Sequence, residues 1–451
     1  MVLPITASLK NMHNSNDVDT VNLEPGSIIR IEGPANVKVL RGSIYALGTV
    51  YSAGSRLTIL RTRKVAVKAL ESTQLDVTLG PEGKVENACP GEEVMDSWTE
   101  AAELIIRSGK RVVILGMMDV GKTTFTIMAM NKAVSSGNVA GVIDADPGQN
   151  DLGPPTTIAC AKSSKPITHL SMLSPLKMVF LRTTSLEHTW QEAVNGVAKL
   201  VDYLETHENV NTTIINTDGW IAEPTAIQYK LSMLSKLSPD SVVIIQKGEE
   251  EDLVNQVKKS GFNPILLPAP PLAIKTREDR RLHREMGYGK YLMPAKSATI
   301  NLTEKPILNL PLSRGVPFDA NIRSLASKYL KMPITYGEQF GKKAIMMSPA
   351  VKELVVKAMP GVEVAILPIN WENGLLVALE DSDGYLVSLG MLKKIYYGSN
   401  KAVVIIPTTI EDLRTVDHIR LGMIRLGDNY EEKEKVHYIN KLEKILGERD
   451  D

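Results

Sequence analysis

Cysteine is nearly absent from this sequence. The 451 residues include only Cys89 and Cys160, which lie far apart in the chain. They form no CxxC pair, so cysteine spacing gives no indication of a zinc site or of a disulfide framework. This scarcity favours a reducing, intracellular location.

Net charge and long apolar runs are also lacking. The 52 lysines and arginines balance 52 aspartates and glutamates. The whole molecule therefore carries no net field that would attract nucleic acid or a membrane, and any polyanion has to be bound locally. No apolar run approaches the ~20 residues that span a bilayer, and the first residues carry no basic flank followed by an apolar stretch. We expect a cytoplasmic protein, and the frequent Lys, Glu, Ile and Met favour an archaeal source.

The length suggests roughly three domains at about 150 residues each. Residues 1–95 contain short β-branched runs broken by Gly and Pro, which predict an N-terminal all-β domain and, over 80–94, a linker. Residues 96–308 predict an α/β domain, and residues 309–451 a mainly β domain. Within the last domain we expect one helix over 349–359, and a charged surface helix at the end of the chain, from 429 to 451.

In the central segment, apolar runs alternate with stretches of helical length. "RVVIL", "GVI" and "TTII" are three of the runs. This alternation predicts a parallel sheet flanked by helices. Ligands of such sheets bind beyond the carboxyl ends of the strands, and the polar motifs of this sequence follow these three runs.

The first of these motifs is "GMMDVGKTTF", residues 116–125, which has the full phosphate-loop pattern. Backbone N–H groups of residues 117–123 at a helix N-terminus surround phosphate oxygens, and two glycines allow the curvature. We expect Lys122 to neutralise the β and γ phosphates and the Thr123 hydroxyl to bind Mg²⁺. The expected nucleotide-binding residues are Gly116, Asp119, Val120, Gly121, Lys122, Thr123 and Thr124.

The second motif is "DADPGQND", which ends another apolar run with two acids. Alternate residues of an extended segment point to opposite sides, so the two carboxylates are expected to have different roles. Asp146 lies farther out on the loop, and we assign it as the general base for an attacking hydroxyl, with Asp144 on the magnesium side. The reverse assignment stays open. Gln149 is expected to contact the acceptor, and an ordinary Asp/Pro/Gly turn is the structural alternative.

Two further motifs carry an aromatic residue and a set of cations. "NTDGW" places Trp220 after Gly219 at the end of a run, where its ring could stack on a nucleobase or pack in a core. "KTREDRRLHREMGYGKY" is patterned as a helix, and its Arg280 and Arg284 share one face, as expected of a lid over a triphosphate. A solvated basic face explains the second motif equally well.

The four motifs together resemble the RNA-processing 5′-hydroxyl polynucleotide kinases. That family includes the kinase subunit of the eukaryotic pre-mRNA cleavage and tRNA-splicing machinery, the ribosomal-RNA-processing kinases and archaeal counterparts. "GPANVKVLRGSIYALG" and "IRLGMIRLG" resemble the family's N-terminal and C-terminal β domains. The resemblance implies a P-loop kinase core over 96–308 that transfers the γ-phosphoryl group of ATP to the 5′-hydroxyl of RNA, or of DNA, with Mg²⁺ as cofactor.

Carried onto this sequence, the resemblance makes Thr217, Gly219 and Trp220 a clasp for the terminal nucleotide, and Arg280 and Arg284 the lid. The sequence departs from the family pattern where "IAEP" follows Trp220 and where Arg182 replaces a glycine. Two other functions remain open. One is an ATP-bound scaffold of an RNA-processing complex without turnover, and the other is a phosphate-loop ATPase or a kinase for a small metabolite. A GTPase is disfavoured, because the strand "SVVII" is followed by "QKGEE" and not by the base-reading NKxD.

Overall fold

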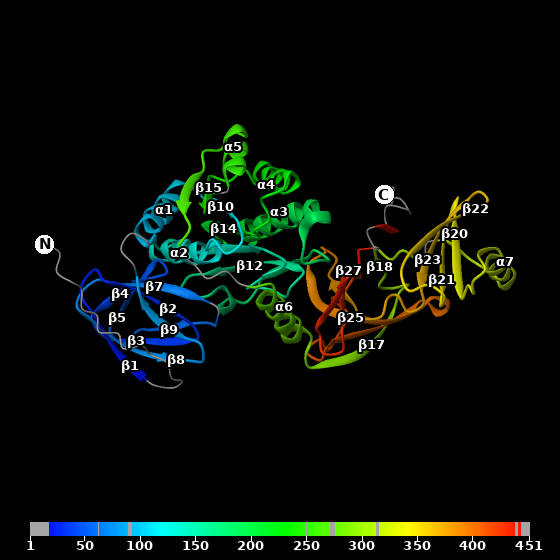
Figure 1. The fold of residues 1–451 in the computed structure, drawn as a ribbon, viewed down its shortest axis with the longest axis horizontal. Coiled ribbons are helices and arrows are strands. Elements are labelled where there is room, and N and C mark those ends of the chain that lie inside the picture. Colours follow the sequence, from blue (N-terminus) through cyan, green and yellow to red (C-terminus); the bar gives the residue numbers. More distant parts are fainter. Residues whose placement is uncertain are drawn as a thin grey trace. The chain divides into compact units, whose positions relative to one another are not determined.

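The computed structural model describes residues 18–61, 63–88, 93–248, 250–270, 276–312, 315–437 and 441–442. Its contacts divide the chain into two compact units, each of which is described by itself. The first consists of residues 1–153, 158–178 and 190–280. The second consists of residues 154–157, 179–189 and 281–451. Figure 1 shows the elements along the chain.

The first unit begins with two antiparallel β-sheets, as the short β-branched runs predict. The four-stranded sheet has the order β1-β8-β3-β6, and the five-stranded sheet has the order β5-β4-β7-β2-β9. Strand β9 contradicts part of the linker predicted over 80–94, because residues 84–87 pair with β2 and so belong to the sheet. The strands are β1 (Val18–Leu23), β2 (Ile28–Glu32), β3 (Ala35–Arg41), β4 (Ser43–Ala46), β5 (Thr49–Ser52), β6 (Arg56–Ile59), β7 (Lys64–Ala69), β8 (Thr73–Leu79) and β9 (Lys84–Asn87).

A seven-stranded sheet of order β13-β12-β11-β14-β10-β15-β16 forms the centre of the first unit. The five strands from β11 to β16 in this order pair in parallel, as predicted. Strand β12 is antiparallel to β11, because no crossover helix separates the two strands and the chain turns back directly. The strands are β10 (Arg111–Gly116), β11 (Ala140–Ala145), β12 (Thr157–Ser163), β13 (Lys177–Phe180), β14 (Thr212–Thr217), β15 (Ser241–Gln246) and β16 (Ile265–Pro268).

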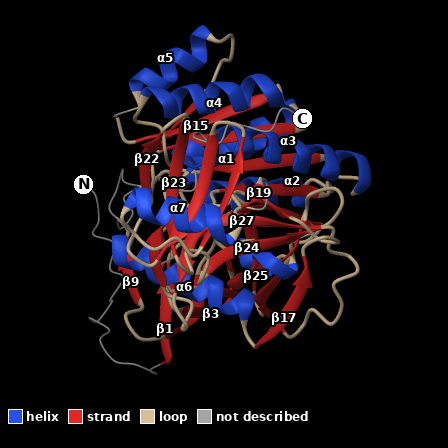
Figure 2. Ribbon diagram, turned by 90° about the vertical axis from the view of Figure 1, so that its right-hand side faces the viewer, coloured by secondary structure: helices blue, strands red, loops and turns tan. Residues whose placement is uncertain are grey.

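Five helices cover this central sheet. Helices α1 (Met95–Ser108) and α2 (Lys122–Ser135) pack against each other, whereas α3 (Trp190–His207), α4 (Pro224–Leu237) and α5 (Glu251–Lys259) form a second group. Figure 1 shows the two groups on opposite sides of the sheet, and Figure 2 shows α4 and α5 next to each other. This arrangement leaves the carboxyl ends of β10, β11 and β14 as neighbours at one edge, which is where the predicted site residues lie.

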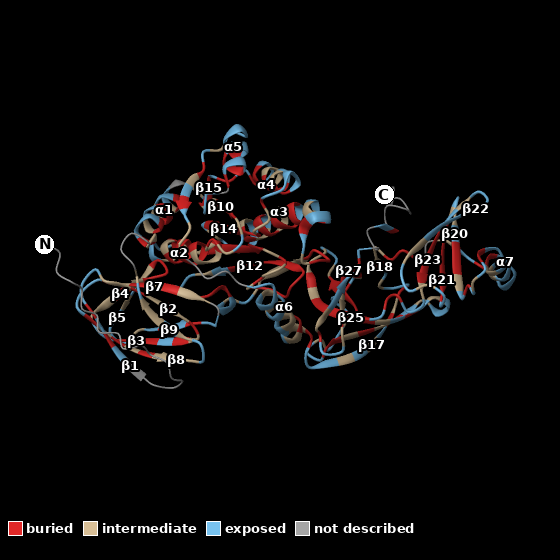
Figure 3. Cartoon of the chain, viewed as in Figure 1, coloured by how far each residue is buried: buried red, intermediate tan, exposed pale blue. Residues whose placement is uncertain are grey.

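One hydrophobic cluster runs through both parts of the first unit. It includes Val37 and Ile44 of the N-terminal sheets as well as Phe125 and Ile114 of the central part. Asn131 of α2 also donates from Nδ2 to the Leu47 carbonyl oxygen at 2.6 Å. Figure 3 shows the buried residues of both parts. The N-terminal sheets therefore share their core with the α/β part, and the boundary predicted at residue 95 stays a prediction.

The second unit contains two mainly antiparallel sheets with one helix between their strands in sequence. The first sheet has the order β17-β26-β25-β24-β27-β18, with β28 paired to β27, and the second has the order β19-β20-β21-β23-β22. The strands are β17 (Ala295–Asn301), β18 (Ile307–Leu308), β19 (Val316–Pro317), β20 (Tyr336–Phe340), β21 (Lys343–Ser348), β22 (Val355–Met359), β23 (Val362–Pro368), β24 (Leu375–Glu380), β25 (Leu386–Tyr396), β26 (Lys401–Pro407), β27 (His418–Leu426) and β28 (Glu432–Lys435).

Two predicted helices of this region are wrong over most of the residues that the structure describes. Residues 355–359 of the expected helix over 349–359 form β22, whereas α7 (Ala320–Leu330) is helical. Val355 and Val356 favour a strand, and Gly361 allows the tight turn into β23, so pairing wins over the helical pattern. Within the expected C-terminal helix over 429–451, residues 432–435 form strand β28 and residues 441–442 are helical, while 438–440 and 443–451 lie outside the described residues.

Helix α6 (Arg277–Leu292) carries the predicted lid arginines; Arg280 belongs to the first unit and Arg284 to the second. Within the described residues, no helix combines the length and the apolar content needed to cross a membrane.

Candidate active site at the carboxyl edge of the central sheet

The phosphate loop joins β10 to α2 and has the geometry of an anion cradle. Gly121 ends the loop with φ +96°, a left-handed conformation that favours glycine, and α2 begins at Lys122. The Nζ of Lys122 donates to the carbonyl oxygens of Gly116 at 2.9 Å and Met117 at 2.6 Å. Burial lowers the pKa of Lys122 to about 8, against the opposing effect of the Asp146 charge. The loop therefore holds a lysine that is still mostly charged at pH 7 and is directed at the backbone of the cradle.

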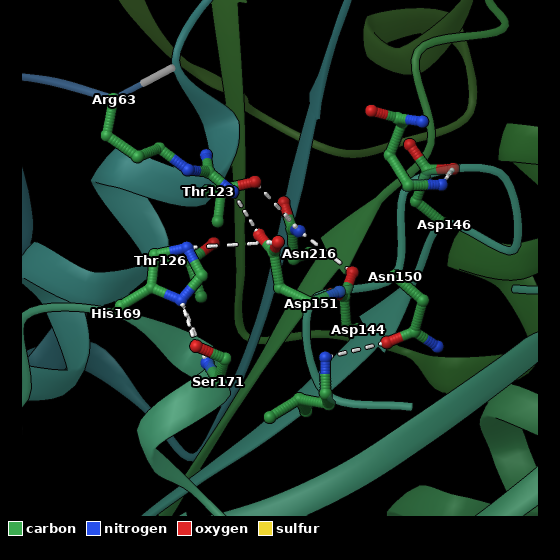
Figure 4. Close-up of polar contacts among 12 residues, drawn as sticks. Arg63, Thr123, Thr126, Asp144, Asp146, Asn150, Asp151, His169, Ser171 and Asn216 are labelled. Carbon is green, nitrogen blue, oxygen red and sulfur yellow. Dashed lines mark hydrogen bonds and ion pairs between the residues drawn. The ribbon is translucent and has the colours of Figure 1, made fainter. Parts of the chain in front are cut away.

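Thr123, Asp144 and Asn216 meet beside the loop. Asn216 at the end of β14 donates from Nδ2 to Asp144 Oδ1 at 3.0 Å and to Thr123 Oγ1 at 3.3 Å. Asp144 is fully buried, and its Oδ2 accepts the backbone N–H of Asp151 at 2.8 Å. Burial and the nearby Asp151 charge raise the pKa of Asp144 well above its usual value. Figure 4 shows this cluster, in which one amide holds two of the predicted metal-binding side chains together.

Asp146 takes a different direction from Asp144, as the alternation along the strand predicts. Its Oδ1 accepts the backbone N–H groups of Gly148 at 2.9 Å and Gln149 at 3.0 Å, and no described residue hydrogen-bonds its Oδ2. Figure 4 shows the two aspartates pointing apart. Burial raises the pKa of Asp146, and the Asp218 charge adds to this effect. Its side chain is thus fixed by one oxygen and presents the other.

An arginine of the N-terminal sheets reaches this cluster. Arg63, which precedes β7, forms an ion pair with Asp151, whose side chain is 3% exposed. His169 lies on the other side of Asp151, with 3.8 Å between His169 Nε2 and Asp151 Oδ1. Because the backbone of Asp151 donates to Asp144, Arg63 is connected through one residue to the metal-binding side chains.

The residues of the "NTDGW" motif form a tight turn at the end of β14. Thr217 is buried, and its hydroxyl donates to the Ile114 carbonyl oxygen at 2.7 Å, so it joins β14 to β10. Gly219 lies against the phosphate loop, since a Cβ at this position would come within 2.6 Å of the Met118 nitrogen. Trp220 follows with a half-buried ring. The structure therefore places the motif directly beside the loop, and the contact between Thr217 and an acceptor stays a prediction.

The lid arginines have different partners. Arg280 forms an ion pair with Asp119 of the phosphate loop, and its carbonyl oxygen accepts the Gln149 side-chain amide at 3.2 Å. Arg284 donates to Glu432 through Nε at 2.8 Å and Nη2 at 2.7 Å. Arg280 is thus in the phosphate-loop region within the first unit, whereas Arg284 is held by an acid of the second unit.

A pocket of mixed polarity opens near the first turn of α2. Thr124, which follows the predicted metal-binding Thr123, is one of its lining residues. The full lining comprises Arg30, Leu47, Lys64, Ala66, Glu93, Val94, Met95, Trp98, Thr124, Met128 and Pro270.

Sequence reasoning missed several members of this site. Asn216 could have been found, because it is an amide at the end of an otherwise apolar strand. Asp218 stands inside the quoted motif, but its role depends on a partner from α4. Asp151 ends the quoted motif "DADPGQND", but its partner Arg63 carries no local signal, because the contact joins residues 88 positions apart.

Comparisons with known proteins agree with this site. Residues 116–293 match the model of the family described as the mRNA cleavage and polyadenylation factor CLP1 P-loop. A Pyrococcus horikoshii protein named polyribonucleotide 5′-hydroxyl-kinase is 26% identical over 348 residues, covering 75% of this chain and 93% of the relative. A Methanocaldococcus jannaschii protein of the same name is 25% identical over 343 residues, covering 75% and 94%.

Residues 116–293 of this chain thus match a CLP1 P-loop domain, and the archaeal relatives match most of the chain. The resemblance predicted from the four motifs is confirmed. The Bos taurus member named polyribonucleotide 5′-hydroxyl-kinase Clp1 is 24% identical over 287 residues, covering 57% of this chain and 65% of the relative.

Solved structures extend the likeness in fold. The structure titled as an extended interface between Pcf11p and Clp1p matches with a TM-score of 0.60 at 14% identity, covering 91% of this chain and 99% of that one. A structure of the wild-type Clp1p–Pcf11p complex matches with a TM-score of 0.59, also at 14% identity. At this identity the matches show that the CLP1-type fold includes the regions on both sides of residues 116–293.

Proposed function

We propose that this protein is an ATP-dependent polynucleotide 5′-hydroxyl kinase whose acceptor is RNA. The observation that carries the proposal is the placement of Asp146 and Trp220 around one phosphate loop. The Asp146 carboxylate presents one oxygen, and the turn before Trp220 packs on Met118 of the loop. A base for a hydroxyl and a flat aromatic surface thus lie beside a triphosphate cradle. The archaeal relatives that match 75% of this chain are also named polyribonucleotide 5′-hydroxyl-kinases.

The reaction needs little covalent help from the protein. The 5′-hydroxyl oxygen of the acceptor forms a bond to the γ-phosphorus while the bond to the β–γ bridging oxygen breaks, and that electron pair leaves on ADP. Asp146 takes the hydroxyl proton on its unengaged oxygen. Lys122 and Arg280 neutralise charge on the phosphates, and the cradle holds the donor in line.

The side chains next to Lys122 fit Mg²⁺. Thr123 and Asp144 provide hydroxyl and carboxylate oxygens, which this cation prefers, and both lie within hydrogen-bond distance of one Asn216 amide. The Oδ1 of Asn216 is buried and has no hydrogen-bond partner among the described residues, as a group next to a polar ligand often does. When bound, the ion would neutralise charge that develops on the phosphates.

We further propose the arrangement of an N-terminal β domain, a kinase core and a C-terminal β domain, with a cytoplasmic location.

Transfer of label from γ-labelled ATP to a short 5′-hydroxyl RNA tests the proposal. A 5′-phosphorylated copy is the acceptor control. We expect Lys122→Ala to reduce transfer by at least about 100-fold. Lys132→Ala on the same helix, whose amine binds Glu103 on the surface, should retain activity.

The same assay separates the competing functions. A DNA copy measures sugar preference, and a mononucleoside acceptor distinguishes a metabolite kinase, which would be indifferent to chain length. ATP that binds without transfer to any acceptor would contradict the proposal and favour a non-catalytic scaffold.

A further inference from the structure

We propose that Asp218, Tyr229 and Lys230 form a positioning network that holds Trp220 in place as the platform for the terminal nucleotide of the acceptor. The inference rests on the proposed kinase function. It assigns a role to a buried lysine and a tyrosine of α4 that no motif identifies. We call these three residues the Asp218 network.

The network is built around a buried ion pair. Lys230 is fully buried, and its Nζ donates to Asp218 Oδ2 at 2.6 Å and to the Asp218 carbonyl oxygen at 3.2 Å. The Tyr229 hydroxyl donates to the same Oδ2 at 2.9 Å. A lysine without any exposed surface is uncommon because desolvation of its charge is costly, so it needs its partners. The pair therefore anchors the turn after β14 to helix α4.

The same aspartate fixes the backbone of the platform residue. Asp218 Oδ1 accepts the backbone N–H of Trp220 at 2.9 Å. One oxygen of the Asp218 carboxylate thus accepts hydrogen bonds from side chains of α4, and the other accepts one from the backbone of the turn. Loss of the Lys230 charge would leave Asp218 as a buried anion that is held only by Tyr229 and the Trp220 amide, and the turn would relax toward solvent.

Tyr229 also supports the indole ring. The Trp220 and Tyr229 rings stack with centroids 6.2 Å apart and planes 27° apart, and Trp220 Nε1 donates to Glu223 at 2.8 Å. The ring of Trp190 lies 6.4 Å from Tyr229. The half-buried indole is therefore fixed in orientation before a base arrives, so stacking of the base costs less ordering entropy.

The turn is fixed against the phosphate loop as well. Between Asp218 and Trp220 stands Gly219, where a side chain would collide with the backbone of Met118. The Asp218 network thus sets the distance between the platform and the cradle. A loosened network should weaken acceptor binding and misplace the hydroxyl, while ATP still has its own loop.

The test compares Lys230→Met with Lys236→Met, an exposed lysine on the same helix, in the full chain with labelled ATP and 5′-hydroxyl RNA. We expect Lys230→Met to raise the acceptor KM about tenfold, within the range measured for loss of one base–aromatic stack, and to change the ATP KM less than about twofold. Lys236→Met should match the wild type in both quantities.

A double-mutant cycle with Trp220→Ala shows whether the lysine acts through the indole. If it does, adding Lys230→Met to Trp220→Ala raises the acceptor KM no further. If Lys230→Met does not fold, Asp218→Asn/Lys230→Met removes both charges together, and Tyr229→Phe removes only the hydroxyl while the ring remains.

Each outcome decides the inference. An unchanged acceptor KM in a folded variant, or fully additive effects in the cycle, would overturn it while leaving the kinase function intact. A wild-type chain that transfers no label to any 5′-hydroxyl would overturn the proposed function, and the inference with it.

Discussion

At the scale of single residues, the lowered pKa of Lys122 gives a prediction about pH. Its folded-state pKa is about 8, so the ATP-free protein loses this charge as the pH rises through that value. If only the charged amine binds the triphosphate, affinity for a non-hydrolysable ATP analogue should fall about tenfold from pH 7 to pH 9. Titration calorimetry at both pH values measures it.

Two variants serve as controls for this pH effect. Lys122→Met should bind the analogue weakly at both pH values, with little difference between them. Lys132→Met, on the same helix, should keep the wild-type dependence. A wild-type affinity that stays constant to pH 9 would show that Lys122 does not titrate in this range.

Asp144 gives a prediction about stability at the same scale. Burial raises its pKa, so its ionised form opposes folding at neutral pH. Asp144→Asn should therefore raise the free energy of unfolding of the metal-free protein, by roughly 1 kcal/mol, while abolishing kinase activity. The new amide can donate to Asn216 Oδ1, which is buried without a partner among the described residues, and its oxygen can still accept from Asp151.

The sign of the Asp144 effect can be checked with pH. A carboxyl whose folded-state pKa is raised destabilises the fold above its unfolded-state value, and not below it. The gain from Asp144→Asn should accordingly be smaller at pH 5 than at pH 8, measured by urea unfolding. A variant less stable than the wild type at pH 8 would contradict the argument.

The site residues that could be predicted from the sequence are those that belong to short motifs. Lys122, Thr123, Asp144 and Asp146 stand in two short motifs, and the strand ends bring them together without further information. Lys230 was invisible, since one lysine in an amphipathic helix reads as a surface residue until the helix is placed over Asp218. The pairing of such residues is decided by the tertiary structure.

At the scale of elements, Arg63 connects the N-terminal sheets to the catalytic loop. Arg63→Met leaves the Asp151 carboxylate, 3% exposed, without its guanidinium. We expect a loss of about 1–3 kcal/mol in the free energy of unfolding and a higher Mg²⁺ concentration for half-maximal activity, because Asp151 also orients Asp144. Urea unfolding and a magnesium titration of the kinase assay measure these changes.

Arg61→Met is the matched control from the same segment. Arg61 pairs with Glu82, and the two side chains are 66% and 70% exposed, so its removal should cost less than about 1 kcal/mol. Equal effects of the two variants on the magnesium titration would refute a special link between Arg63 and the metal-binding residues.

The elements predicted from periodicity succeeded where strands and helices are long and regular. β10, β11 and β14 with their helices follow the predicted order. The pattern of residues 349–359 predicts a helix, but residues 355–359 form a strand that pairs with β23. A short stretch of sequence gives no information about the strand with which it will pair. Short β-branched segments are therefore the ones whose secondary structure is predicted wrongly.

At the scale of the whole molecule, the hydrophobic clusters predict which parts unfold together. The hydrophobic cluster of the first unit joins the N-terminal sheets to the kinase core, whereas the second unit has clusters of its own around Trp371 and Phe318. This cluster, which both parts share, predicts that the β-sheets and the P-loop part of the first unit unfold together, although the sequence divides them into two domains.

Calorimetry tests this view of the molecule. Because the two units have separate cores, we expect the protein to show two thermal transitions. A non-hydrolysable ATP analogue with Mg²⁺ should raise the temperature of only one of them. At about 100 times its dissociation constant the analogue adds roughly 2.7 kcal/mol to the unit that binds it. Lys122→Ala should remove that shift and leave the other transition in place. Both transitions rising together would show that the units unfold as one cooperative body, and a third transition insensitive to the analogue would show that the N-terminal sheets unfold apart from the kinase core.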